Sequence, residues 1–210
     1  MELSLKNRNA IVCGSTQGIG EASAIEIAKL GANVMLIARN ESKLLDVLND
    51  LDTSKGQTHS FIAVDFRDSE KLKEKVSLLK SSYHILVNNT GGPAAGPIVE
   101  ADTNAFEGVF RMHLINNQIL VQNVVDGMKK EGFGRIVNII STSVKAPIAG
   151  LGVSNTIRAA VANWAKTLSV ELGAYGITVN NVLPGFTNTN RLKSLITKKA
   201  QIQGLSLIHI

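Results

Sequence analysis

A glycine-rich turn follows the first apolar run of the chain, residues 10–12. Three glycines, Gly14, Gly18 and Gly20, stand at the spacing G-x3-G-x-G, and residues 21–28 continue as a helix-forming segment. Glycines let a backbone turn sharply and approach a pyrophosphate, while the N-terminus of the following helix offers free N–H groups and a positive dipole end. The turn therefore predicts a dinucleotide site, with a purely structural turn as the alternative.

Apolar runs of strand length alternate with amphipathic segments along the chain. The runs cover residues 10–13, 33–38, 60–64, 84–87, 135–140 and 178–183. Between them, apolar side chains recur at helical spacing, for example Ile157, Val161, Trp164 and Leu168. This alternation predicts an α/β fold in a single domain, a doubly wound parallel sheet of the Rossmann type. Loops after the strand C-termini, such as residues 91–97, are where such sheets bind ligands.

Composition bounds the class of protein. A chain of 210 residues, 44% of them hydrophobic, is long enough for one domain with a substantial core. The formal charge is +5 and the pI about 9.4, but basic residues alternate with acids, as in residues 70–75. This pattern is typical of a solvated helix face, so no nucleic-acid partner is expected. The positive balance suits an anionic cofactor.

Cysteine, histidine and hydropathy patterns narrow the class further. Cys13 is the single cysteine, so it cannot form an internal disulfide, and its place at a strand end indicates a small buried residue. The four histidines show no ligand spacing, so no metal is expected. No apolar stretch reaches the roughly 18 residues of a membrane span, and residues 1–6 lack the layout of a secretory signal. We expect a cytoplasmic protein without a membrane partner.

Four motifs in order carry a resemblance to a known family. Besides the glycine turn, they are residues 88–91 (NNTG), residues 134–141 (GRIVNIIS) and residues 180–185 (NNVLPG). They resemble the short-chain dehydrogenase/reductase family over about residues 5–190, and look most like its 3-oxoacyl-acyl-carrier-protein reductase-like branch. The resemblance implies a dinucleotide-binding and catalytic domain at residues 1–190, and an incomplete C-terminal substrate-side segment at residues 191–210.

The resemblance also implies which residues hold the cofactor. The glycine turn would face its phosphates, Asp65 the adenine, residues after the fourth strand the adenosine ribose, and residues after the sixth the nicotinamide amide and the phosphates. For Asp65 and the asparagines, turn capping by short polar side chains is the alternative. The expected cofactor-binding residues are Gly14, Ser15, Thr16, Gln17, Gly18, Ile19, Gly20, Arg39, Asn40, Asp65, Asn88, Asn89, Gly91, Pro184, Gly185, Thr187 and Thr189.

The end of the second strand indicates which cofactor binds. An acidic residue about 20 positions after the glycine turn would bind the ribose 2′-hydroxyl of NAD. Here Ala38 offers no acceptor, and Arg39 presents a guanidinium fork suited to a phosphate. The sequence therefore predicts NADP in preference to NAD, with a solvated Arg39 as the alternative.

The positions that carry the family's hydride chemistry are altered. Ser141 fits the family's serine, but Ser154 and Arg158 stand where the family has tyrosine and lysine, and His113 stands where it has a helix asparagine. A serine hydroxyl is a much weaker acid than tyrosine, and arginine stays protonated. His113, whose unperturbed pKa is about 6.5, would relay a proton through water or through Ser154 to the substrate carbonyl oxygen. A hydrogen-bonded core histidine is the alternative.

The tail also departs from the family. Members usually continue past the motif at residues 180–185 with a substrate-covering helix and a last strand, and residues 204–210 here are apolar without a visible partner. We expect a truncated chain that lacks the last strand; a short natural tail that packs on a partner subunit is the alternative.

These observations predict an NADP-dependent oxidoreductase that transfers a hydride between the nicotinamide and a small carbonyl or alcohol substrate. A dinucleotide-binding sensor or scaffold without turnover is the competing class, and a lyase or isomerase-like branch is a third. The apolar segments at residues 103–131 and 153–173 look like the family's dimer-forming pair, so we expect a homodimer.

Overall fold

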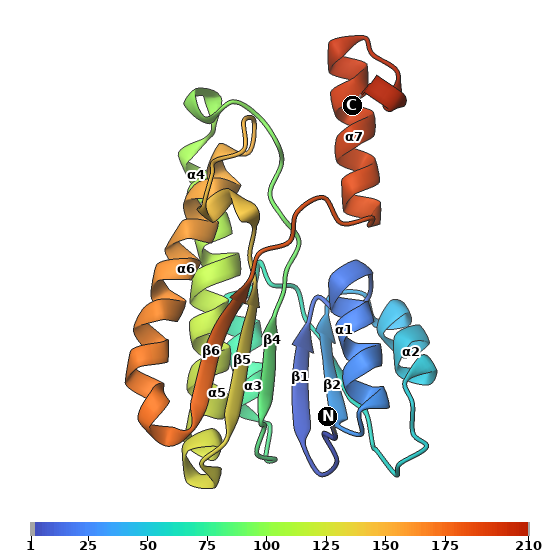
Figure 1. Ribbon diagram of the computed structural model, residues 1–210, viewed down its shortest axis with the longest axis vertical. Helices are drawn as coiled ribbons and strands as arrows, with labels where there is room; N and C mark the ends of the chain where they lie inside the picture. Colours follow the sequence, from blue (N-terminus) through green and yellow to red (C-terminus); the bar gives the residue numbers. More distant parts are fainter. Residues whose placement is uncertain (1–2, 210) are drawn as a thin grey trace.

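A six-stranded parallel sheet forms the centre of the protein, in the strand order β3-β2-β1-β4-β5-β6. A computed structural model describes residues 3–209. The predicted doubly wound α/β sheet is confirmed, and each strand begins and ends within one residue of its predicted bounds. The strands are β1 (Asn9–Cys13), β2 (Asn33–Ala38), β3 (Ser60–Ala63), β4 (Ile85–Asn88), β5 (Gly134–Ile139) and β6 (Ile177–Val182) (Figure 1).

Helices cover both faces of the sheet. The longer ones are α1 (Gly18–Lys29), α2 (Glu41–Asp50), α3 (Ser69–Ser77), α4 (Thr103–Phe110), α5 (Asn116–Glu131), α6 (Gly152–Leu172) and α7 (Asn190–Gln203). A π-helical turn, η2 (Arg111–Ile115), joins α4 to α5, and short 3-10 turns are η1 (Ile98–Glu100), η3 (Thr142–Val144), η4 (Gly173–Tyr175) and η5 (Leu207–His209).

Two apolar clusters fix these layers. Helices α1 and α2 pack on one face through small and branched side chains such as Ala24, Ala28 and Leu44. Helices α3 and α5 cover the other face, where Leu72 and Leu120 are fully buried, and α6 packs beside α5. Because strands buried on both faces need apolar side chains throughout, this arrangement explains the continuous apolar runs of the sequence.

Helix starts follow the local sequence. The side chains of Asn40, Asp68, Asp102 and Thr189 accept hydrogen bonds from backbone N–H groups in the first turns of α2, α3, α4 and α7. Such caps satisfy N–H groups that have no partner inside the helix. Each capping residue lies in a loop that leaves the carboxyl edge of the sheet, so the caps also fix how these loops turn.

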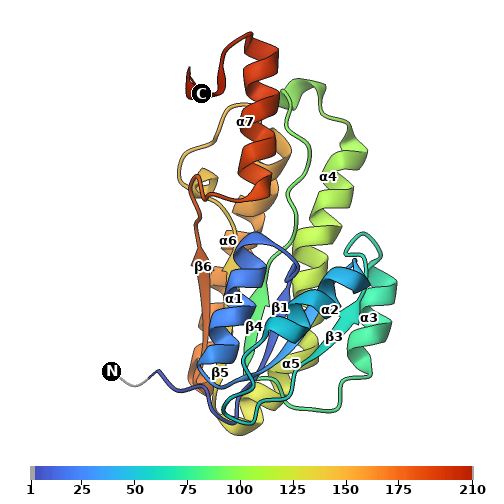
Figure 2. The same ribbon diagram turned by 90° about the vertical axis from the view of Figure 1, so that its right-hand side faces the viewer.

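The strand order reverses between β1 and β4, which lie side by side. In open parallel sheets, the crevice at the carboxyl ends of such strands is where ligands bind. Helix α7 stands above this edge, away from the two helical layers (Figures 1 and 2). Its Arg191 donates a hydrogen bond to the carbonyl oxygen of Pro93, at 2.6 Å, in the loop after β4. The C-terminal segment thus meets the β4 loop above the crevice.

Candidate dinucleotide and catalytic site

The glycine turn lies at the reversal point, between β1 and α1. Gly14 and Gly18 have positive φ angles of 58° and 59°, a region that disfavours other residues. A Cβ on Gly20 would collide with the carbonyl oxygen of Gly14 and lie 2.7 Å from Nδ2 of Asn89. Only glycine fits there, because the start of α1 is pressed against the turn.

The turn leaves polar groups for a phosphate. Ser15 is fully buried, and its Oγ atom has no hydrogen-bond partner within residues 3–209. Gln17 caps α1 without a side-chain hydrogen bond, so the first N–H groups of α1 are not taken by their own cap. An unpartnered buried hydroxyl beside a helix N-terminus fits the pyrophosphate of a dinucleotide. Thr16 and Ile19 complete this turn.

Loops from β4 and β6 close on the glycine turn. Nδ2 of Asn89 lies 3.2 Å from the carbonyl oxygen of Cys13 and 3.3 Å from that of Gly14. The methyl group of Thr189 would lie 3.2 Å from a Cβ on Gly18, which places the segment after β6 directly over the turn. The carbonyl oxygen of Pro184 accepts a hydrogen bond from the N–H of Thr142, which holds the start of that segment beside η3. Within the segment, the carbonyl oxygen of Gly185 accepts from the N–H of Thr187. Gly91 follows in the β4 loop.

Asn88 has a structural role beneath the site. Its Nδ2 donates to Oδ1 of Asn138 at 2.8 Å, and Nδ2 of Asn138 donates to Oδ1 of Asn181 at 3.0 Å. The three residues are in register on β4, β5 and β6, and Asn88 and Asn138 are buried. This ladder accounts for the predicted support of the central sheet. The predicted approach of Asn88 to the ribose stays a prediction.

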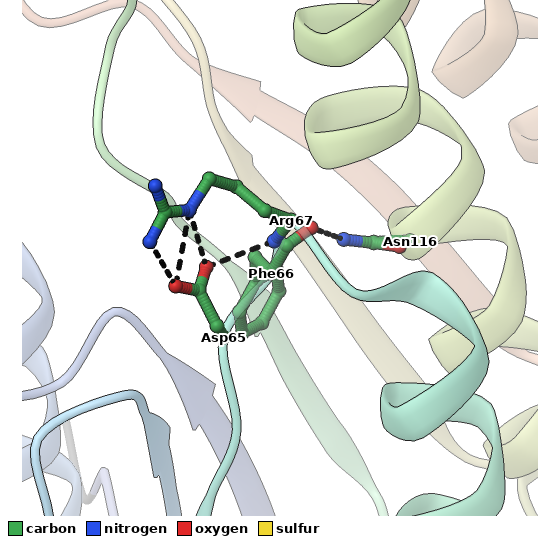
Figure 3. A network of polar contacts seen from close by, with 4 residues as sticks. All are labelled: Asp65, Phe66, Arg67 and Asn116. Carbon is green, nitrogen blue, oxygen red and sulfur yellow. Dashed lines mark hydrogen bonds and ion pairs between the residues drawn. The ribbon is translucent and has the colours of Figure 1, made fainter.

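A cavity of about 490 Å³ opens beside the carboxyl ends of β2 and β3. Arg39, Asn40 and Asp65 line it, with Asp68 and Lys71 from the start of α3. Figure 3 shows the Asp65 carboxylate held by the guanidinium of Arg67, with N–O distances of 2.6 to 3.2 Å. Hydrogen bonds from Arg67 hold the pKa of Asp65 below its usual value.

The two interpretations of Asp65 are compatible. Its Oδ1 caps the turn by accepting from the N–H of Arg67 at 2.9 Å, and the same side chain lines the cavity. Asn40 likewise caps α2 through Lys43 at 3.0 Å and faces the cavity. Turn capping therefore fixes these side chains at the cavity wall.

The predicted catalytic hydroxyls stand where α6 packs beside η3. Ser141 caps η3, its Oγ accepting from the N–H of Ser143 at 3.1 Å. Ser154 lies in the first turn of α6, and Arg158 lies one turn further along the same helix. Nη1 of Arg158 donates to the carbonyl oxygen of Ile139 at 2.6 Å. Burial lowers the pKa of Arg158 to about 10, so the guanidinium stays charged at neutral pH.

His113 differs from what its sequence position suggests. It is buried in η2, and Oγ1 of Thr90 lies 2.6 Å from its Nδ1. Burial, and next the charge of Arg158, lower the pKa of His113 to about 3. The pKa therefore lies well below the unperturbed value of 6.5 on which the predicted proton relay depends, because the ring is desolvated beside a cation. A neutral, hydrogen-bonded histidine in the core is what the structure shows.

Sequence reasoning missed several polar residues of the site. Thr90, the partner of His113, sits in the β4 motif where only its neighbours were assigned. Oδ1 of Asn155 is buried without a hydrogen-bond partner among the described residues. Lys71 reaches the cavity from α3. A signal for Lys71 was present in the sequence: Asp68 is a typical helix-capping residue, and a helix that begins there has Lys71 in its first turn.

Other features of the chain are structural. Burial raises the pKa of Cys13 to about 12, so the thiol stays protonated, as expected for a small buried residue. Within residues 3–209, no three His, Cys, Asp or Glu side chains gather as a metal site would require. Over the same residues, no helix is both long and apolar enough to span a membrane.

Comparisons with known proteins agree with this geometry. The family model for short chain dehydrogenase matches residues 8–200. Dehydrogenase/reductase SDR family member 4 of Oryctolagus cuniculus is 30% identical over 205 residues, which cover 96% of this chain and 78% of that protein.

Two solved structures extend the comparison. L-sorbose reductase from Gluconobacter frateurii, complexed with NADPH and L-sorbose, has a TM-score of 0.89 and 27% identity over 100% of this chain and 81% of that one. Actinorhodin polyketide ketoreductase with NADPH has a TM-score of 0.87 and 28% identity, over 100% of this chain and 80% of that one. The ketoreductase agrees with the branch that the sequence resembles. From its fold, its glycine turn and the family match over residues 8–200, this chain belongs to the short-chain dehydrogenase family.

Proposed function

We propose that this protein is an NADP-dependent oxidoreductase that transfers a hydride between the nicotinamide and a carbonyl or alcohol substrate. The observation that carries the proposal is the placement of three polar residues beside the end of β5: Ser141 caps η3, and Ser154 and Arg158 lie in the first turns of α6, which packs against η3. L-sorbose reductase and actinorhodin ketoreductase, both structurally similar, are complexed with NADPH.

The residues present fit this cofactor. Ser15 and the first N–H groups of α1 would hold the pyrophosphate, and the loop from Pro184 to Thr189 would cover it. Arg39 in the cavity beside β2 would bind the 2′-phosphate, because its guanidinium fork matches phosphate oxygens. Arg158 would hold the nicotinamide ribose from the opposite side of the reversal point.

The bound cofactor would supply or accept the hydride at the substrate carbon. The hydroxyls of Ser141 and Ser154 would donate hydrogen bonds to the carbonyl oxygen, and the Arg158 cation would stabilise the negative charge that develops there. The product alcohol would take its proton from Ser154, which regains one from water. Since a serine hydroxyl is a poor acid at neutral pH, we expect slow turnover.

His113 would act on this site by position. A pKa of about 3 leaves its ring neutral at physiological pH, so it is not a proton donor there. Its contact with Thr90 holds the β4 loop against η2, next to the Arg158 charge. We therefore propose a positioning role for His113 in place of the proton relay.

One observation favours the competing class, a dinucleotide-binding sensor or scaffold. Ser154 and Arg158 are poor general acids, and His113, the nearby imidazole, has a pKa of about 3. Those residues leave the site without a side chain that titrates near neutral pH. Binding without turnover would follow directly from that chemistry.

Oxidation of NADPH in the presence of a carbonyl panel separates the two functions. The panel holds ketoses, aldehydes and 3-oxoacyl thioesters, and the products are identified by mass spectrometry. We expect reduction of one class, lowered at least about tenfold in Ser154→Ala and in Ser141→Ala. Thr156→Ala, on the exposed side of α6, is the matched control and should keep full activity. Saturable NADPH binding with no reduction of any class would contradict the enzyme and support the sensor.

A further inference from the structure

The residues that line the cavity beside β2 and β3 come from two separate elements. Arg39 and Asn40 come from the loop after β2, whereas Asp68 and Lys71 come from the start of α3, with Asp65 between them. A ligand in this space of about 490 Å³ would therefore lie between two elements that are far apart in sequence. The charge of that ligand can be inferred from the charged side chains of the cavity that have no partner among the described residues.

Both carboxylates of the cavity already have partners from their own loop. Asp65 receives two side-chain nitrogens and the backbone N–H of Arg67 (Figure 3). Asp68 accepts from the backbone N–H of Lys71 at 2.9 Å and caps α3. Because these negative charges are compensated by an ion pair and by a helix N-terminus, they oppose an anionic ligand only weakly.

The two cations of the cavity, Arg39 and Lys71, lack such partners in the described part of the chain. Within residues 3–209, neither the guanidinium of Arg39 nor the ammonium of Lys71 has a hydrogen bond or an ion pair to the protein. Lys75, one turn further along α3, donates its Nζ to the carbonyl oxygen of Ala63 at 2.9 Å. The charge of Arg39 also acts on Asp65, but neither cation is held by a hydrogen bond or an ion pair within that range, so each element offers the cavity a positive charge.

We propose that Lys71 is a second residue that selects the cofactor, and that it binds the 2′-phosphate from α3, in the cavity that Arg39 also lines. This inference rests on the proposed NADP-dependent function. Arg39 supplies a planar fork and Lys71 a compact charge on a flexible stem, so together they can neutralise a dianion. NADH carries a 2′-hydroxyl at that position, so its affinity should not depend on Lys71.

Binding constants of NADPH and NADH, measured by fluorescence with the full chain, test this role. Lys71→Gln should weaken NADPH about tenfold and change NADH by less than about twofold. Lys73→Gln is the matched control, since Lys73 is exposed on α3 and does not line the cavity. The NADPH effect should shrink at high salt, because a partly exposed charge is screened.

Competition with fragments identifies the group that Lys71 contacts. For the wild type, 2′,5′-ADP should displace NADPH at lower concentrations than 5′-AMP, and Lys71→Gln should narrow that difference. Displacement by inorganic phosphate as effective as that by 2′,5′-ADP would indicate a site for free phosphate and would overturn the assignment to the nucleotide.

The same measurements distinguish an error in the role of Lys71 from an error in the proposed NADP-dependent function. If the wild type prefers NADPH and Lys71→Gln keeps that preference, as Lys73→Gln does, the role of Lys71 is wrong and the proposed function stands. If the wild type binds neither cofactor, both are wrong.

Discussion

Nη1 of Arg158 lies 2.6 Å from the carbonyl oxygen of Ile139, the last residue of β5. This hydrogen bond anchors a guanidinium from α6 at the carboxyl edge of the sheet. Among the described residues, no carboxylate forms an ion pair with it, and its charge acts on the neighbouring His113. A cation held in this way is available to a ligand that brings its own negative charge or oxygen lone pairs.

Replacing this cation should affect both stability and activity. We expect Arg158→Met to cost about 1–3 kcal/mol of unfolding free energy, because the carbonyl of Ile139 loses its donor. It should also lower kcat/KM at least about tenfold. Arg158→Lys should recover part of the activity, and Arg111→Met, exposed on η2, should change neither quantity. Denaturant titration and steady-state kinetics measure the two effects; full activity in Arg158→Met would refute the role.

His113 should make the protein less stable in mild acid. Its pKa in the folded chain is about 3, below its ordinary value of 6.5. Between these values the unfolded chain binds more protons, so stability is full above about pH 6.5 and falls toward pH 3. From pH 7.5 to pH 5 the loss should be about 2 kcal/mol.

The variant His113→Asn isolates this contribution, since asparagine does not titrate. Urea denaturation at both pH values should show a smaller stability difference for this variant than for the wild type. Substitution of the exposed His209 by Asn is the control and should leave the wild-type difference unchanged. An equal difference in wild type and His113→Asn would show that the ring is not held neutral.

Gly20→Ala should abolish NADPH binding. The added methyl group would collide with the carbonyl oxygen of Gly14, so the start of α1 must move away from the turn. Gly108→Ala is a matched control in the exposed part of α4, where an added Cβ meets no atom within 4 Å. It should stabilise the protein by about 0.5–1 kcal/mol and leave binding intact. If Gly20→Ala bound NADPH as tightly as the wild type does, the inferred role of the turn in binding would be contradicted.

The asparagine ladder should contribute strongly to stability. Asn138→Ala would leave Nδ2 of Asn88 and Oδ1 of Asn181 without their partners, and should cost about 2–4 kcal/mol. Asn181→Ala, at the edge strand, should cost less because it removes only one bond of the ladder and leaves a single group, Nδ2 of Asn138, without its partner. The double variant Asn88→Ala/Asn138→Ala should cost less than the sum of its single variants, since the second substitution removes a group already unpaired. Strict additivity would indicate that the ladder is not coupled.

The sequence could predict the sheet because its evidence is local and repeated. Strands such as β4 are built on continuous apolar runs, here residues 85–87, and buried parallel strands need such runs. The glycine turn could be predicted for the same reason, since its conformation depends on three residues of one short segment. The family match over residues 8–200 agrees with both predictions.

The candidate site could be predicted only in part, because it depends on contacts between distant segments. The pKa of His113 follows from burial and from Arg158, which lies 45 positions along the chain in another helix. The Asn88–Asn138–Asn181 ladder requires the register of three strands. Lys71 and Arg39 share a cavity that no spacing rule connects. The homodimer, the cytoplasmic location and the truncated tail stay predictions.

A fluorescence titration of the purified chain with NADPH, and in parallel with NADH, tests the central claim most directly. The account predicts saturable binding of both, with NADPH at least about tenfold tighter because Arg39 meets the 2′-phosphate. Gly20→Ala should remove the response to both cofactors. Absence of saturable binding by the wild type, or an NADH affinity equal to or higher than that for NADPH, would contradict the account.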